Sequence, residues 1–575
     1  MLSIFDGQNL FVMINRYFLL MGTLLFSACS KSKGGDGNEP AVNRQPVASI
    51  AADLITVNPF TYKFTVVASD PDLDALTYSW DFGEGTIRTG KAEESFDYVI
   101  DKEFVVKVKV SDGKSNPTEV TVSVNTKTVS VAVDNSKKFQ TMEGFGGFGA
   151  LKEYWAQAPF TSDEFVNTIV NDLGLTILRD NMPTSFEYEN DNSDPFATDF
   201  TKFNLTVKPA GHDETVNDHL DHLRKLKAAG LQKLIVSVWS PATWMKHNNR
   251  VGNGTQSINS APAYTTSPTS ATNQLRTEMY DEFAERCVAY IKIIKQETGL
   301  DIYALSVQNE PRFSQYYASC VYDGPALRDL LKTVGKRLRD EGLATKLFLP
   351  EDVGWLQGGE ALTRPTLDDP VARGYTDIIA MHGYDLDGIT AASTSAQTWQ
   401  TMYGWGAPYN KPLWMTETSG YENSYAGALK LGKAMFTALK YGNVSAWVFW
   451  SLSGTTLDAY TLMSSTGDKS KRYYVSKNFF KYIRPGAVRV DASAPEGTSV
   501  FPLAFQHSTE NSTTMVLIND GASGKAVKIS GAGLPAQFNR YSTTIDDNTK
   551  DMGVVNTADV ILLPANSIIT LYKKS

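Results

Sequence analysis

Two glutamates end apolar runs of β type in this chain. Glu310 closes the run that begins at Ile302, and Glu417 closes the run that begins at Pro412. A buried carboxylate without a partner costs free energy, so carboxylates at the tips of core strands are candidates for chemistry. Hydrolysis of a glycosidic bond needs such a pair, because one group protonates the leaving oxygen while the other attacks or activates water. The pair indicates an enzyme.

Further polar and aromatic residues stand at the ends of other apolar runs. They are Arg179, Asp180, Trp239, Asn309, Glu351, Asp352, His382, Tyr384 and Trp450. In a closed parallel barrel the strand ends surround one pocket, although they are far apart in sequence. Glu351 and Asp352 form a rival carboxylate pair, but neighbours on a strand point to opposite faces, so they cannot flank one bond.

The elements that must position these residues alternate between short β runs and helical runs. The candidate strands are 144–150, 175–180, 233–239, 302–309, 346–351, 377–382, 412–417 and 445–450. Helical patterns lie between them, at 162–172, 218–229, 275–296, 326–341 and 426–441. Eight βα units in this order predict a closed (β/α)8 TIM barrel, which we assign to residues 141–482.

Alternating β runs flank the predicted barrel on both sides. Residues 46–126 predict a small immunoglobulin-like β-sandwich, and the string from Ser69 to Gly83 resembles the PKD-type module. Its Trp80 is expected in the core, with glycan binding as the alternative. Residues 483–575 predict a C-terminal side β-sandwich, and we assign 128–140 to it because that run has no partner of its own in the barrel.

The N-terminus is typical of a bacterial lipoprotein signal. The apolar stretch from Tyr17 to Phe26 has about half the ~20 residues that a membrane span requires, and it ends in small residues before Cys29. We expect a signal peptide at 1–28, lipidation of Cys29, and a flexible tether at 29–45. This places the protein in the cell envelope, at the outer membrane or cell surface. An ordinary cleaved signal remains the alternative.

Composition limits the partners. The chain has 575 residues, enough for several domains, and a net charge of −9 without a long basic run, which argues against nucleic-acid binding.

Cys287 and Cys320 make no disulfide framework, and whether they are bridged stays open. His219 and His222 are three apart on a predicted helix, but no third ligand accompanies them. We expect no metal, no organic cofactor and a monomer.

Four ordered motifs carry a family resemblance. The tripeptide Asn309-Glu310-Pro311, with a glutamate ending the seventh strand, resembles the retaining (β/α)8 glycoside hydrolases. The whole set is similar to family 30 over about residues 128–575. Its motifs are Glu143-Gly-Phe-Gly-Gly147, Trp239-Ser-Pro-Ala-Thr-Trp-Met-Lys246, Ser306-Val-Gln-Asn-Glu-Pro311 and Tyr473-Tyr-Val-Ser-Lys-Asn-Phe-Phe-Lys-Tyr-Ile-Arg-Pro-Gly486.

The resemblance implies roles for the residues at the strand ends. Glu310 would be the acid/base and Glu417 the nucleophile, with their carboxyls about 5–5.5 Å apart. Asn309 would bind the sugar 2-hydroxyl, and Arg179 would keep Glu417 ionised. The remaining members are Tyr384 or His382, which would orient the nucleophile, and three sugar platforms, Trp239, Trp244 and Trp450.

The resemblance leaves several substrates open. We expect a retaining endo-β-glycanase that hydrolyses xylan of the glucuronoxylan type, with Lys469, Lys471 or Arg472 available to meet a uronate carboxylate. A β-1,6-glucanase or galactanase of the same family is the alternative, as is a catalytically silent glycan-binding lipoprotein. In each case the partner is a β-linked polysaccharide or oligosaccharide, and contact with the membrane is through the N-terminal lipid alone.

Overall fold

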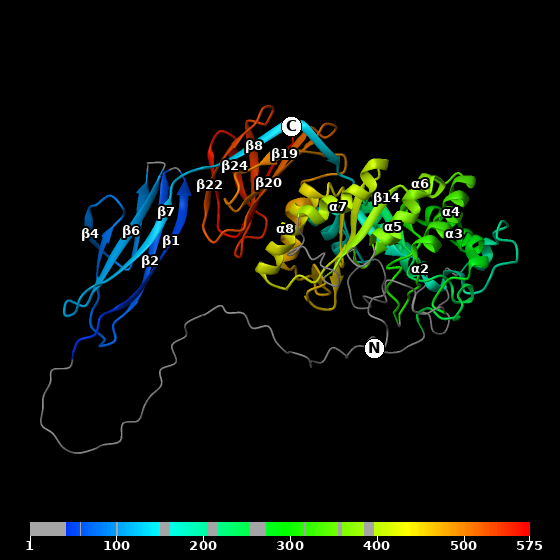
Figure 1. The fold of residues 1–575 in the computed structure, drawn as a ribbon, viewed down its shortest axis with the longest axis horizontal. Helices are drawn as coiled ribbons and strands as arrows, with labels where there is room; N and C mark the ends of the chain where they lie inside the picture. The colour runs from blue at the N-terminus through cyan, green and yellow to red at the C-terminus, as the bar shows by residue number, and fades with distance from the viewer. Residues whose placement is uncertain are drawn as a thin grey trace, which may run out of the picture.

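The computed structural model describes residues 42–57, 59–98, 102–149, 162–203, 216–253, 272–315, 317–354, 359–384 and 396–574. A small β domain, a C-terminal β unit and a barrel follow one another in space (Figure 1), with the β unit in the middle. The expected signal peptide, Cys29 and most of the tether lie outside the described residues. No helix within the described part of the chain is both long and apolar enough to span a membrane.

Eight parallel strands close a barrel, so the predicted fold class is confirmed. Each strand pairs with the next in sequence, and the last pairs with the first to complete the ring. The strands are β9 (Gly144–Phe148), β10 (Ile177–Asn181), β11 (Lys233–Ser237), β12 (Ile302–Ser306), β13 (Lys346–Asp352), β14 (Ile378–Gly383), β15 (Leu413–Thr418) and β16 (Ala446–Phe449).

Helices surround the barrel. They are α1 (Asp163–Asn167), α2 (Val216–Ala229), α3 (Tyr280–Thr298), α4 (Gly324–Asp340), α5 (Gly359–Asp368), α6 (Pro370–Tyr375), α7 (Ala396–Gly406), α8 (Tyr425–Tyr441) and α9 (Lys471–Phe480). Side-chain caps begin several of them; Ser424, for example, accepts a hydrogen bond from the third residue of α8 at 3.1 Å. The predicted helix at 162–172 is instead α1 followed by a π-helical turn, Thr168–Leu173, which ends at Gly174 in the left-handed region.

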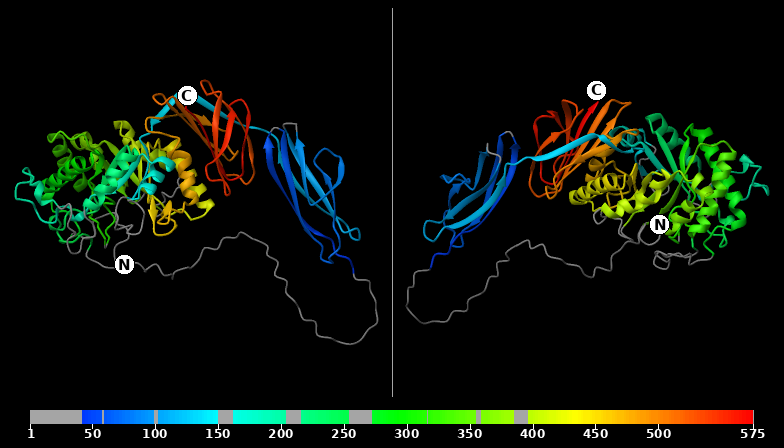
Figure 2. Two further views of the ribbon diagram at one scale, coloured as in Figure 1. Left: turned by 180° about the vertical axis from the view of Figure 1, so that it is seen from behind. Right: turned by 45° about the horizontal axis from the view of Figure 1, so that its top comes forward.

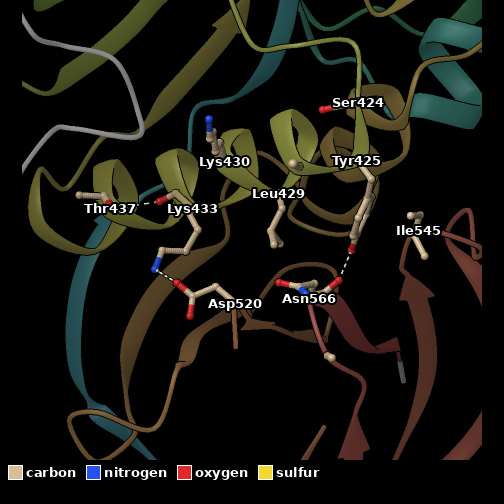
Figure 3. A pocket seen from close by; sticks show the side chains of 11 residues that line it. Ser424, Tyr425, Leu429, Lys430, Lys433, Thr437, Asp520, Ile545 and Asn566 are labelled. Atoms are coloured by element: carbon tan, nitrogen blue, oxygen red, sulfur yellow. Dashed lines mark hydrogen bonds and ion pairs between the residues drawn. The ribbon is translucent and has the colours of Figure 1, made fainter. Parts of the chain in front are cut away.

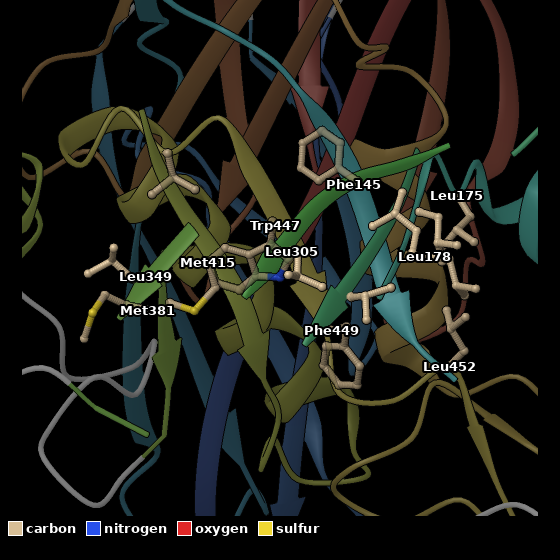
Figure 4. Packing of buried hydrophobic residues seen from close by; sticks show 14 of the residues in the cluster. Phe145, Leu175, Leu178, Leu305, Leu349, Met381, Met415, Trp447, Phe449 and Leu452 are labelled. Carbon is tan, nitrogen blue, oxygen red and sulfur yellow. The ribbon is translucent and has the colours of Figure 1, made fainter. Parts of the chain in front are cut away.

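Apolar side chains fill both faces of the barrel wall. The inner cluster consists of Ile177, Ile235, Ala304, Phe348, Ile378, Ala380, Trp414, Ala446 and Val448. Outward-pointing residues such as Leu178, Leu305 and Met415 pack beneath the helices (Figure 4). A Cβ atom on Gly146 would lie 2.0 Å from the carbonyl oxygen of Ile177, so β9 needs glycine to approach β10 this closely.

The predicted C-terminal β unit is confirmed, and its strands form one continuous nine-stranded sheet. Its order is β24-β23-β26-β21-β20-β19-β8-β22-β25, and residues from both ends share one core. β8 (Val129–Thr141) lies between β19 and β22 and pairs with residues 347 or more positions further along the chain (488 − 141 = 347). The other strands are β19 (Val488–Ser493), β20 (Val500–His507), β21 (Ser512–Asn519), β22 (Lys525–Ser530), β23 (Gln537–Thr543), β24 (Lys550–Asn556), β25 (Val560–Leu563) and β26 (Ser567–Lys574).

Helix α8 joins the barrel to this sheet. Tyr425 donates its hydroxyl hydrogen to the carbonyl of Asn566 at 2.5 Å, and Lys433 pairs with Asp520 at 2.5 Å (Figure 3). A cavity of about 1100 Å³ lies between the helix and the sheet. These polar links, together with the apolar contacts beneath them, attach the sheet to the helix that follows β15.

The N-terminal domain is a two-sheet sandwich beside the C-terminal sheet (Figure 2). Trp80 is 1% exposed, and its indole N–H donates to the carbonyl of Lys91 at 3.0 Å, so it is a core residue. Leu562 of β25 packs against this core. The strands are β1 (Val47–Val57), β2 (Phe60–Ser69), β3 (Thr77–Asp81), β4 (Ile87–Gly90), β5 (Glu93–Tyr98), β6 (Glu103–Ser111) and β7 (Thr118–Asn125).

The question of a disulfide is settled for the two described cysteines. Cys287 and Cys320 are both buried and free. They behave as small apolar residues of the barrel's outer core, where both are fully enclosed.

We expect Trp414→Ala to lower the free energy of unfolding of the barrel by about 3–5 kcal/mol, because it empties a large part of the inner cluster. Urea denaturation followed by circular dichroism measures the change. Val371→Ala is the control, since Val371 is 53% exposed and its truncation should change stability by less than about 0.5 kcal/mol. Equal stability of the two variants would contradict this description of the core.

Candidate active site

The two glutamates meet at the carboxyl ends of the barrel strands. Glu310 follows β12 and Glu417 lies in β15; they are 7% and 6% exposed. One carboxylate oxygen of each lies within 4.8 Å of the other and of a ring nitrogen of His382. Both carboxylates are therefore nearly enclosed and close enough to act on one bond.

Arg179 is the centre of the hydrogen-bond network around them. Its guanidinium is fully buried and donates to Glu417 at 2.5 Å, to Glu351 at 2.9 Å and to the Asn309 side-chain oxygen at 2.6 Å. The same group lies over the ring of Trp239, 4.7 Å from its centroid. Its charge-assisted hydrogen bond holds the Glu417 carboxylate in a fixed orientation.

Two further side chains, Tyr384 and His382, contact the two carboxylates. The Tyr384 hydroxyl donates to the second oxygen of Glu417 at 2.6 Å. His382 contacts Glu310 through Nδ1 at 3.0 Å, while its Nε2 lies 3.6 Å from Glu351. Tyr384 thus orients the predicted nucleophile, whereas His382 is bound chiefly to the predicted acid.

The main chain at Glu310 is held in an unusual conformation. Glu310 and Glu351 have φ angles of 48° and 54°, in the left-handed region that costs non-glycine residues about 1 kcal/mol or more. The Glu310 N–H donates to the Glu351 carbonyl at 2.9 Å, and the Gln308 side chain donates to the Trp239 carbonyl at 2.8 Å. Hydrogen bonds with Glu351 of β13 and with Trp239, which follows β11, therefore fix the main-chain conformation that directs the Glu310 side chain.

Burial controls the protonation of the site. It is the largest cause that raises the pKa of Glu310 to about 7, and the charge of Glu417 acts in the same direction while His382 opposes it. Burial disfavours charge on His382, but Glu417, Glu310 and Glu351 around it raise its pKa to about 9. Burial also opposes ionisation of Glu351, yet Arg179 lowers its pKa below the usual value.

These shifts, on Glu310, His382 and Glu351, favour a proton on Glu310. The two cations, Arg179 and His382, offset only two of the three carboxyl groups, Glu310, Glu351 and Glu417. A third ionised carboxylate would leave an uncompensated buried charge, which is costly. The arrangement therefore favours a proton on Glu310 up to about pH 7, as a general acid requires.

Aromatic rings line one side of the site. Phe148 stacks on Trp450 with centroids 4.2 Å apart, and Trp239 lies 5.5 Å from Phe148. Trp244 is not part of this cluster: its indole N–H donates to the Glu187 carbonyl at 3.3 Å, and its ring packs against the barrel's outer core. The expectation of a third sugar platform at Trp244 has no support in these contacts, and Phe148 is an aromatic that the sequence interpretation missed.

Comparison with known proteins agrees with this geometry. A family model for the PKD domain matches residues 49–124. Glucuronoxylanase XynC of Bacillus subtilis is 27% identical over 312 residues, covering 52% of this chain and 68% of XynC. Endo-1,6-beta-D-glucanase of Neurospora crassa is 23% identical over 414 residues, covering 67% of this chain and 80% of that protein.

The fold has close counterparts among solved structures. The family 30 subfamily 8 xylanase Xyn30A of Clostridium acetobutylicum superposes with a TM-score of 0.60 and 23% identity, over 78% of this chain and all of that one. The chain therefore shares the fold of a glycoside hydrolase family 30 enzyme. The enzyme carries a PKD domain before the barrel, so both resemblances seen in the sequence are confirmed.

Glu351 is the residue of this site that the sequence interpretation undervalued. It is 0% exposed and accepts hydrogen bonds from Arg179 and from the Ser237 hydroxyl, both at 2.9 Å. Its neighbour Asp352 points elsewhere and pairs with Arg312 at 2.7 Å. Glu351 and Asp352 therefore do not act as a carboxylate pair, as expected. Glu351 instead holds Arg179, which in turn contacts Glu417.

The loop after the eighth strand does not supply a uronate-binding cation from the three residues predicted. Lys469 pairs with Asp172 at 3.1 Å, and Lys471 donates to the main chain between β23 and β24 at 2.9 Å. Arg472 is 0% exposed and donates to the Tyr421 carbonyl at 2.6 Å. All three anchor the barrel's outer layer, so that interpretation is wrong for the described contacts.

Metal binding at the catalytic cluster is disfavoured by its own hydrogen bonds. Glu310, His382 and Glu417 have the spacing of a ligand set. The guanidinium of Arg179 already donates to Glu417 at 2.5 Å. A metal ion bound to Glu417 would therefore lie beside this positive charge and compete with it for the same carboxylate. His222 is buried on α2, and the side chain of His219 lies outside the described residues.

The enzyme should lose activity as the pH rises through about 7, because Glu310 must be protonated to act as an acid. The pH dependence of kcat/KM on a polysaccharide substrate measures this limb. The first step on a dinitrophenyl glycoside needs no proton, so its rate should persist above pH 7. Identical basic limbs for the two substrates would contradict the role of Glu310.

Replacement of Glu351 by glutamine should lower kcat/KM roughly 10- to 100-fold, because Arg179 and His382 lose the negative charge of their shared partner. Loss of its negative charge should also move the basic limb of the pH profile to lower pH. Glu360→Gln is the matched control, since Glu360 is 56% exposed on α5. A Glu351→Gln variant with the wild-type pH profile would show that Glu351 has a purely structural role.

Proposed function

We propose that this enzyme is a retaining endo-β-glycanase. The observation that carries the proposal is the closeness of Glu310 and Glu417. One carboxylate oxygen of Glu310 lies within 4.8 Å of one carboxylate oxygen of Glu417. Retaining glycosidases have carboxyls about 5–5.5 Å apart, whereas inverting ones leave about 6.5–9.5 Å for a water molecule between them. The short separation favours direct attack by a carboxylate.

In the first step, Glu417 attacks the anomeric carbon while the glycosidic C–O bond breaks. Glu310 transfers its proton to the leaving oxygen, and Arg179 and Tyr384 keep the Glu417 carboxylate aligned through their hydrogen bonds. A covalent glycosyl ester on Glu417 results. The aromatic group of Phe148, Trp239 and Trp450 offers apolar faces for the sugar rings.

In the second step, Glu310 is a base. It takes a proton from water, whose oxygen attacks the anomeric carbon and releases Glu417 as a carboxylate. Two displacements at the same carbon restore its original configuration. Asn309, fixed by its hydrogen bond from Arg179, is placed to bind the 2-hydroxyl of the sugar during both steps.

Xylan is the substrate that we propose. The glucuronoxylanase XynC and the xylanase Xyn30A support it by similarity, while the Neurospora crassa endo-1,6-beta-D-glucanase supports β-1,6-glucan as the alternative. Because Lys469, Lys471 and Arg472 are engaged in the fold, the proposal concerns the xylan backbone and does not depend on glucuronate branches.

A polysaccharide panel tests the substrate. Glucuronoxylan and arabinoxylan should both release oligosaccharides, with little release from β-1,6-glucan. Cleavage of glucuronoxylan alone would show that a uronate is required after all, and cleavage of β-1,6-glucan alone would establish the alternative. Binding without cleavage of any β-glycan would overturn the assignment as an active glycanase.

Removal of the nucleophile tests the mechanism. Glu417→Ala should reduce turnover by a factor of at least about 10⁴, because the covalent step is lost. Azide should restore product formation, and the glycosyl azide should have inverted configuration, since only one displacement remains. Restored product of retained configuration would assign the nucleophile to another residue. Glu360→Ala should need no rescue.

We also propose attachment to the cell envelope by a lipid on Cys29, with the enzyme acting as a monomer. The support is the small-residue run before Cys29 that follows an apolar stretch too short to span a membrane. Mass spectrometry of the N-terminal peptide from the native host should show a diacylglyceryl group, and Cys29→Ser should release the protein in soluble form. An unmodified Cys29, or its absence from the mature protein, would favour an ordinary cleaved signal.

A further inference from the structure

A second group of carboxylates lies where the segment after β10 meets helix α3. Glu187 and Asp191 come from that segment, and Glu282 and Glu285 come from the first turns of the helix. One oxygen each of Glu187, Asp191 and Glu282 lie within 4.8 Å of one another. None of these residues belongs to the catalytic cluster.

These carboxylates are enclosed. The exposed fractions are 1% for Glu187, 0% for Glu285, 7% for Glu282 and 9% for Asp191. Enclosed carboxylates are stable only when a cation, a hydrogen-bond donor or a proton compensates them. The group therefore needs a compensating partner for several charges at once.

Glu187 is the member whose side chain points into the group without a hydrogen bond. Neither of its carboxylate oxygens accepts one from the described residues. Its nearest cation is Arg286, with Nε at 3.9 Å, and that guanidinium also donates to the Pro183 carbonyl at 2.6 Å. One guanidinium at this distance does not balance four carboxylates.

The other members have partial compensation. Asp191 accepts hydrogen bonds from the main-chain N–H groups of Asn192 at 3.0 Å and Asp199 at 2.6 Å, which hold its carboxylate in place. Glu282 receives a long hydrogen bond of 3.5 Å from Asn190 on one oxygen only. Arg337 faces Glu285 from α4, but its guanidinium already pairs with Glu341 at 3.1 Å.

The oxygens lie close enough together to share one ion, since oxygens bound to Ca²⁺ at about 2.3–2.6 Å lie no more than ~5 Å apart. Ca²⁺ accepts several carboxylates in irregular geometry, whereas Mg²⁺ demands a near-ideal octahedron and keeps several of its waters, which favours Ca²⁺ for this group. Only oxygen ligands are present in the group, which disfavours zinc. We propose that Glu187, Asp191 and Glu282 form a Ca²⁺ site, with Glu285 adding negative charge beside it.

The ion would tie the segment after β10 to α3. That segment follows directly on the strand that carries Arg179, and the Glu187 carbonyl accepts the indole N–H of Trp244. The role is structural, so the site stabilises this part of the barrel rim and takes no part in bond cleavage. It is independent of the substrate and of the catalytic mechanism proposed above.

Two opposing accounts can be separated by experiment. If Ca²⁺ compensates the group, binding shifts the folding equilibrium by mass action. If protons compensate it, burial that raises the pKa of Glu187 to about 8 and of Glu285 to about 7 would make stability fall as pH rises through 7–8, with or without Ca²⁺. The two accounts differ in whether added Ca²⁺ has an effect at fixed pH.

The test uses the full chain, treated with a chelator and dialysed at pH 7.5. Saturating CaCl2 should raise Tm by at least about 2 °C, with a smaller rise for MgCl2. Isothermal titration with CaCl2 should give one site per chain. Glu187→Gln with Glu282→Gln should abolish both effects while circular dichroism shows a folded protein.

Glu278→Gln is the matched control, because Glu278 precedes the same helix and is 59% exposed. This variant should keep the full Ca²⁺-dependent rise in Tm. The proposal is overturned if CaCl2 leaves the Tm of the wild-type chain unchanged. It is equally overturned if the rise persists in the double variant, since the ion would then bind elsewhere.

Discussion

The buried guanidinium of Arg179 is the interaction on which the catalytic arrangement depends. Arg179 is fully buried and donates hydrogen bonds to Glu417, Glu351 and Asn309. Side chains from three other parts of the barrel rim therefore contact one positive charge. Without it, two carboxylates would be enclosed with His382 as their only nearby cation among the described residues, and burial would push protons onto them. The division of labour between an ionised and a protonated glutamate follows from this single placement.

The barrel makes that convergence possible. Strands β10, β12, β13, β14 and β15 each bring one charged or amide side chain to the same edge, and close packing of apolar residues inside the wall keeps the edge rigid. The left-handed main chain at Glu310 and Glu351 is tolerated because hydrogen bonds from neighbouring strands fix it. The rigid wall thus holds the strained positions that direct the two catalytic side chains.

The parts of the fold that could be predicted are those with a local period. Alternation of β and helical runs located all eight barrel strands, and placing residues at strand ends brought Glu310, Glu417, Arg179 and His382 together correctly. Trp244 lies apart from the other aromatic residues because a short 3-10 turn, Thr243–Met245, directs its indole toward Glu187, and its role as a sugar platform stays a prediction. The pairing of Lys469 with Asp172 and the continuity of the nine-stranded sheet depend on contacts between distant segments, which leave no period in the sequence.

The central claim is that Glu417 forms the covalent bond while Glu310 moves the proton. A dinitrophenyl 2-deoxy-2-fluoro glycoside of the cleaved sugar tests it most directly, because the fluorine slows the second step more than the first and the ester accumulates. Peptide mass spectrometry of the trapped enzyme should then find the sugar on Glu417 alone. A label on Glu310 or Glu351, or inactivation without any covalent sugar, would contradict the account.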